Sequence, residues 1–129
     1  MSLGLIDRNE LLTFDWFAAT YKNTLFPPRE LVRLKKAASG LEIVIFIGTW
    51  CGDTHDQLPP FMKLLDSAGI KKISIFALDR TKTYPGFKNE RLITKLPTFV
   101  VLIDGKEIGR ITETPKTTLL DDLTGFLLP

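Results

Sequence analysis

The chain has 129 residues, of which 44% are hydrophobic and 25% are charged. This size and composition indicate one folded domain over residues 1–129 and exclude a disordered polar chain. The 17 basic and 15 acidic residues leave a formal charge of +2 and are spread along the chain, so we expect neither nucleic acid nor a membrane as a partner. No apolar run approaches the roughly 20 residues of a membrane span, and residues 1–4 show no secretory signal, so we expect a cytoplasmic protein.

Two helices are predicted in residues 1–40, which we treat as an N-terminal helical extension. The first begins at Asp7, because Asp7 and Glu10 have the spacing of a capping box. The second places Leu34 and other apolar residues on one face and ends at Gly40, a residue suited to a left-handed helix end. Apolar residues at helical spacing support the first helix: Leu11, Phe14, Phe17, Ala18 and Tyr21.

From residue 41 the pattern changes to strands alternating with helices. Residues 43–47 form a β-branched run between glycines, which predicts a strand buried on both faces. Apolar residues at helical spacing from Leu58 to Ala68 predict a helix that ends at Gly69. Residues 73–78 predict a second strand, so this part has the pattern of a strand-helix-strand unit.

The remaining third of the chain predicts a short helix, a hairpin and a last helix. Residues 86–95 are weakly helical, and residues 99–111 predict a hairpin whose turn is Asp104-Gly105. The last helix is predicted with Thr114 as its N-cap and Pro115 at its first position. The whole order predicts an α/β fold with a mixed four-stranded sheet flanked by helices.

Cys51 is the single cysteine, so no disulfide can form within one chain. It lies where the predicted buried strand gives way to a helix, beside free backbone N–H groups and the positive end of the helix dipole. That place favours the thiolate, which is the nucleophilic form. The alternative is a small packed apolar residue. Trp50 supplies a large ring that a tight turn leaves partly exposed, which favours a reactive or binding role.

Trp50-Cys51-Gly52 at a strand-to-helix turn resembles the W-C-G-P-C loop of the thioredoxin superfamily. Pro59, eight residues after Cys51, is similar to the proline that kinks the thioredoxin active-site helix. Leu96-Pro97-Thr98 resembles the I-P-T segment whose cis-proline faces the cysteine. The resemblance covers residues 41–127 and implies a thioredoxin-like core with thiol-disulfide chemistry. The substrate-binding residues that it implies are Trp50, Gly52, Asp53, Leu96, Pro97 and Thr98.

The departures from that family concern the second half of the reaction. Thr54 stands in the place of the resolving cysteine, and Ile45 in that of a buried aspartate that moves protons for it. Without a second thiol, an outside thiol must release the mixed disulfide. The resemblance therefore implies an oxidoreductase that acts through Cys51 alone. Its partners would be protein or small-molecule thiols and disulfides such as glutathione, and we expect a monomer without a cofactor.

Thr54 and His55 are the candidate catalytic helpers of Cys51. Thr54 either donates a hydrogen bond to the thiolate or bonds backbone in the first helical turn. His55 either protonates a leaving thiol or is an exposed side chain. A metal held by Cys51 and His55 is disfavoured, because structural zinc takes four ligands. Arg80, after the second strand, either binds a substrate carboxylate or forms a surface ion pair.

Two other functions stay open from the sequence. Residues 51–54 also resemble the C-G-x-T of glutathione peroxidases, whose cysteine attacks peroxide, although the W-N-F segment of those enzymes is absent. The other alternative is a binding module that uses the groove around Trp50 and Pro97 without redox chemistry, since a fold does not fix a function.

Overall fold

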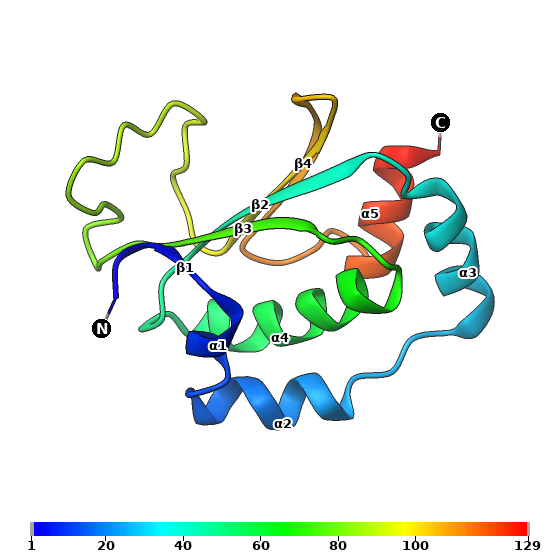
Figure 1. The fold of residues 1–129 in the computed structure, drawn as a ribbon, viewed down its shortest axis with the longest axis horizontal. Helices are drawn as coiled ribbons and strands as arrows, with labels where there is room; N and C mark the ends of the chain where they lie inside the picture. Colours follow the sequence, from blue (N-terminus) through cyan, green and yellow to red (C-terminus); the bar gives the residue numbers. More distant parts are fainter. Residues whose placement is uncertain (1, 129) are drawn as a thin grey trace.

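The computed structural model describes residues 2–128, and Figure 1 shows the path of the chain. The chain contains both strands and helices, as an α/β fold requires. The elements in chain order are β1 (Gly4–Ile6), α1 (Arg8–Leu11), α2 (Asp15–Asn23), α3 (Pro28–Ala37), β2 (Leu41–Ile47), α4 (Gly52–Ser67), β3 (Lys72–Ala77), β4 (Thr98–Ile103), β5 (Lys106–Thr112) and α5 (Leu119–Leu127).

The sheet is mixed, as predicted, and it has a fifth strand that the sequence did not predict. Its strand order is β1-β3-β2-β4-β5. The central strand β2 is parallel to β3 and antiparallel to β4, while β5 pairs antiparallel with β4. The added strand β1 pairs antiparallel with β3, where Gly4 lies opposite Ala77. A strand of three residues is too short to show the alternation of apolar and polar residues that predicts a strand. Its formation depends on backbone pairing with β3, which is distant in the sequence.

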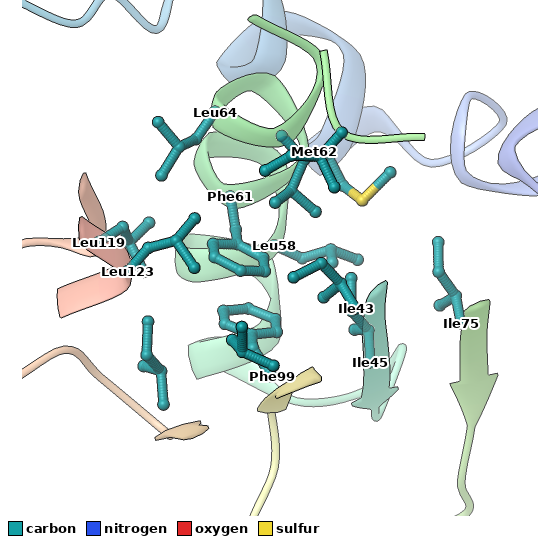
Figure 2. Close-up of a cluster of buried hydrophobic side chains, with 14 of the residues drawn as sticks. Ile43, Ile45, Leu58, Phe61, Met62, Leu64, Ile75, Phe99, Leu119 and Leu123 are labelled. Carbon is teal, nitrogen blue, oxygen red and sulfur yellow. The ribbon is translucent and has the colours of Figure 1, made fainter. Parts of the chain in front are cut away.

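One face of the sheet is covered by α4 and α5, and α2 packs on α4 on the side away from the sheet (Figure 1). The main core lies between that face and these helices. At its centre, Phe61 of α4 stacks on Phe99 of β4 with ring centroids 4.0 Å apart and planes 8° apart (Figure 2). Both rings are completely buried, and removing so much apolar surface from water is the largest favourable term in folding.

The opposite face of the sheet carries a second apolar cluster, because alternate residues of β2 point to opposite faces. Val44 and Phe46 belong to this cluster, and Tyr84 and Phe87 from residues 78–97 pack against it. Phe46 also stacks on Phe76 of β3, with centroids 5.5 Å apart. Residues 78–97 form no helix over this face, so a groove of about 460 Å³ opens between them and the strands.

The N-terminal extension differs from the two helices predicted for residues 1–40. Asp7 caps α1 as predicted, because its carboxylate accepts a hydrogen bond from the Glu10 N–H at 3.0 Å. The helix then stops at Leu11, since the Thr13 hydroxyl donates to the Glu10 carbonyl at 2.6 Å and closes a turn. A new helix, α2, begins at Asp15. The extension therefore contains β1 and three helices.

Asp66 near the end of α4 ties the extension to the core. Its carboxylate accepts hydrogen bonds from the guanidinium of Arg8 and from the hydroxyl of Tyr21. Partial burial alone would raise the pKa of Asp66, but the hydrogen bonds from Arg8 and Tyr21 outweigh it and hold that pKa below its ordinary value. Three helices thus meet at one charged group.

The predicted helix over residues 86–95 is wrong. In the structure these residues form turns, and Asn89 and Leu92 both have positive φ angles, 25° and 57°. The Asn89 side chain accepts from the Ile93 N–H at 2.7 Å and donates to the Ile93 carbonyl at 3.0 Å. Such local side-chain bonds compete with helical ones, which explains the failure of a weak helical pattern.

The predicted start of the last helix is also wrong. Its N-cap is Thr118 instead of Thr114, and the Thr118 hydroxyl oxygen accepts from the Asp121 N–H at 3.0 Å. Asp122 holds the preceding backbone outside the helix, because its carboxylate accepts from the N–H groups of Lys116 and Thr117. The helix begins where its own capping bonds are best satisfied.

Candidate active site

Cys51 is the N-cap of α4, at the strand-to-helix turn that the sequence predicts. Its backbone is extended, with φ −93° and ψ 125°, and its N–H donates to the Gly48 carbonyl at 2.9 Å. The side chain is half-buried, and Sγ lies 3.6 Å from the carbonyl oxygen of Leu96. The side chain therefore stands at the positive end of a long helix.

The structure brings the Leu96 carbonyl to Cys51, at the start of residues 96–98. The peptide bond between Leu96 and Pro97 is cis. The side chains of all three residues are buried, and the Thr98 hydroxyl donates to the Lys95 carbonyl at 2.7 Å. This segment leads directly into β4, so the antiparallel pairing of β4 with β2 brings it to the cysteine.

Trp50 is fixed on both its edge and its face. Its Nε1–H donates to the carbonyl of Leu78 at 2.9 Å. Its ring lies so close to Gly48 that a Cβ atom there would stand 2.6 Å from Cε2 of the indole. The ring also packs against the second apolar cluster, together with Cys51. The tryptophan is therefore a rigid wall of the site.

Thr54 is completely buried, and its hydroxyl oxygen accepts a hydrogen bond from the Gly48 N–H at 3.3 Å. This is a bond to backbone, although its partner lies in the turn before α4 and not in the first helical turn. A hydroxyl also has one proton to donate. Thr54 thus stabilises the turn that presents Cys51.

His55 bonds the loop before Cys51 and packs on α2. Its Nε2 lies 2.6 Å from the carbonyl oxygen of Thr49, so the ring donates an N–H there. The ring also stacks on Trp16 of α2, with centroids 4.3 Å apart and planes 19° apart. Among residues 2–128, the hydrogen bond of this ring goes to the loop before Cys51 and not to the sulfur. The sequence gives no signal for the role of Trp16.

Gly52 and Asp53 begin α4 at the surface side of the site. Gly52 is exposed, and an added Cβ there would meet no atom within 4 Å. Asp53 is half-buried in the first turn, where a carboxylate suits the positive end of the helix dipole.

Arg80 lies beside this loop, with its guanidinium carbon 5.3 Å from the centroid of the Trp50 ring. Among residues 2–128, no carboxylate forms an ion pair with it, so the predicted surface ion pair is not present there. Its neighbour Asp79 instead accepts from the Thr81 hydroxyl and from two backbone N–H groups. The Thr81 hydroxyl is the main cause that lowers the pKa of Asp79.

Neither a metal site nor a membrane-spanning helix is found in residues 2–128. No group of three or more histidine, cysteine or acidic side chains in this range is arranged to hold a metal ion. None of the helices in the same range has the length and apolar character to cross a membrane.

The chain resembles a known thioredoxin in sequence over part of its length. No model of a known protein family matches the chain. The chloroplastic thioredoxin Y of Oryza sativa subsp. japonica is 32% identical over 68 residues, which are 53% of this chain and 39% of that protein. The chain thus matches about two fifths of the length of this curated relative.

Two solved structures resemble the fold. A protein of unknown function from Pseudomonas aeruginosa has a TM-score of 0.68 at 15% identity, over 95% of this chain and 89% of its own. Trxlp from Edwardsiella tarda EIB202 has a TM-score of 0.50 at 16% identity, over 81% of this chain and 96% of its own. At these identities the likeness concerns the fold alone.

Proposed function

We propose that this chain, whose fold is thioredoxin-like, is a thiol-disulfide oxidoreductase of the thioredoxin superfamily that acts through Cys51 alone. The observation that carries the proposal is the place of the sulfur. Sγ stands at the N-terminus of α4 and 3.6 Å from the Leu96 carbonyl, next to the cis peptide bond. A disulfide bound along residues 96–98 would present a sulfur atom to the thiolate of Cys51.

The proposed reaction has two exchange steps. The thiolate of Cys51 attacks one sulfur of a disulfide, forms a mixed disulfide with it, and releases the other sulfur as a thiolate. An external thiolate then attacks the substrate sulfur of the mixed disulfide and returns Cys51 as a thiolate. Thr54 has no thiol, so this second attack comes from outside the chain, and glutathione is the small thiol that we propose for it.

The neighbours of Cys51 have separate roles in this proposal. Thr54 and His55 hold the turn, because one bonds the Gly48 N–H and the other bonds the Thr49 carbonyl. Trp50 forms one wall of the substrate groove, and residues 96–98 form the facing backbone. Gly52 and Asp53 leave the entrance free for the second thiol. We also propose that the protein works as a monomer in a reducing compartment such as the cytoplasm.

The direct test is the covalent intermediate. Incubation of the reduced protein with oxidised glutathione should give one glutathione per chain by intact mass, and reduced glutathione should remove it. Cys51→Ser is the matched control and should give no adduct. If the wild-type protein forms no adduct while the same thiol is alkylated readily, the oxidoreductase proposal is wrong and the binding module is favoured.

A gain of the second thiol tests the one-cysteine cycle. Thr54→Cys places a thiol one helical turn from Cys51, close enough for a disulfide. We expect this variant to lose the glutathione adduct quickly and to form an internal disulfide. Persistence of the adduct at the wild-type level would show that the site does not exchange thiols along the proposed path.

A further inference from the structure

Arg80 is held against Trp50, the residue before Cys51, by a contact that leaves its charge available. Its guanidinium lies over the ring of Trp50, and a cation over an indole face is attracted by the ring quadrupole. The indole itself is fixed, because Nε1 donates to the Leu78 carbonyl and the ring packs on Gly48. A long, exposed side chain thus contacts the fixed ring of Trp50, the residue before Cys51.

The charge of Arg80 is not neutralised within the described residues. Two other arginines form ion pairs, Arg8 with Asp66 and Arg110 with Glu107 at 2.7 Å, whereas Arg80 forms none with a carboxylate of residues 2–128. Asp79 is the acidic residue next to Arg80, and its carboxylate is occupied by the turn over Thr81 and Thr83. A cation–π contact, unlike an ion pair, leaves N–H donors free for a carboxylate.

We propose that Arg80 is a specificity-determining residue that binds a carboxylate of the disulfide substrate. This inference rests on the proposed function and names its substrate class: small disulfides that carry a carboxylate near the reacting sulfur, in preference to neutral or cationic ones. The planar guanidinium suits a carboxylate because its N–H groups form a fork that matches two oxygens.

Disulfide probes of different charge test this selectivity. Ellman's reagent carries carboxylates, dipyridyl disulfide is neutral, and cystamine is cationic. Second-order rate constants for Cys51 with each probe are measured at low salt for the wild type and for Arg80→Gln. The substitution should slow the anionic probe about two- to fivefold, the size expected for one exposed charge pair. It should leave the neutral probe unchanged and accelerate the cationic one, and added salt should reduce the difference.

Lys82→Gln provides the matched control, because it removes another exposed cation of the same loop. Its effect on the rate constant of each probe should be smaller than the effect of Arg80→Gln on the rate constant of the anionic probe. Arg80→Lys keeps the charge without the planar fork and should recover part of the rate.

Two results would overturn the inference about Arg80. One is an equal effect of Arg80→Gln on all three probes, which would indicate a change in the thiol itself. The other is an equal decrease, in Lys82→Gln, of the rate constant for the anionic probe, which would indicate a general electrostatic effect of the loop's positive charge. Because any accessible thiol reacts with these probes, the outcome is separate from the glutathione cycle, whose failure would be seen as the missing adduct.

Discussion

Gly48→Ala tests how the turn before Cys51 is built. The ring of Trp50 occupies the space where a side chain at Gly48 would be, because a Cβ there would lie only 2.6 Å from Cε2 and 2.8 Å from Cζ2 of the indole. Contacts so short do not occur, so the indole must move. The φ angle of Gly48 lies outside the left-handed region, and the backbone therefore accepts alanine without strain. The cost comes from the displaced ring.

The size of that cost follows from two contributions. Overpacking a tightly filled site destabilises a protein by about 1–3 kcal/mol. Moving the ring also weakens the hydrogen bond from Trp50 to the Leu78 carbonyl, which is worth about 1 kcal/mol. We expect the free energy of unfolding to fall by about 2–3 kcal/mol, which for a chain of this length lowers the melting temperature by roughly 6–12 °C.

Gly52→Ala is the matched control, because both glycines flank the Trp50-Cys51 pair and an added Cβ at Gly52 meets nothing within 4 Å. Alanine in the first turn of a helix should leave stability unchanged or raise it by up to about 1 kcal/mol. Urea unfolding is followed by circular dichroism, since tryptophan fluorescence would report the moved ring itself. In a Trp50→Leu background, Gly48→Ala should cost much less. The reasoning is refuted if Gly48→Ala costs no more than Gly52→Ala.

Three further predictions concern the core and the extension. Asp66 has a lowered pKa in the folded state, so its stabilising bonds are complete at neutral pH and are lost as the pH falls below about 4. Asp66→Asn should lower the free energy of unfolding by about 1 kcal/mol at neutral pH. In urea unfolding, this variant should also lose less stability between neutral and acidic pH than the wild type. Phe99→Ala removes the buried partner of Phe61 and should cost about 3–5 kcal/mol in the same assay. Trp16→Leu removes the ring stacked on His55 and should speed alkylation of the cysteine with little loss of global stability.

The parts of the fold that sequence reasoning predicted are those whose determinants are local. The hairpin turn has Asp104 at φ 51° and Gly105 at φ 77°, the conformation for which that residue pair is selected. The strand from residue 43 and the helix after Cys51 follow from strong apolar patterns of the right period. In such segments, local preference and tertiary burial favour the same structure.

The parts of the fold that were predicted wrongly depend on partners far along the chain or on single side-chain bonds. The strand β1 exists because β3 offers it a free edge. The turns over residues 86–95 depend on Asn89, whose bonds replace those of a helix. At the site, the spacing predicts His55 near the helical face of Cys51, but Trp16 and the Thr49 carbonyl decide where its ring lies. Sequence distance gave no indication of either partner.

The stack of Trp16 on His55 has a consequence for how the cysteine loop opens. His55 bonds the Thr49 carbonyl, and Trp16 holds that ring from α2, so the loop and the N-terminal helix share one set of contacts. Proteins open in cooperative units whose free energies lie below that of global unfolding. We therefore expect the unit that opens around the loop before Cys51 to include α2, because Trp16 of this helix stacks on His55.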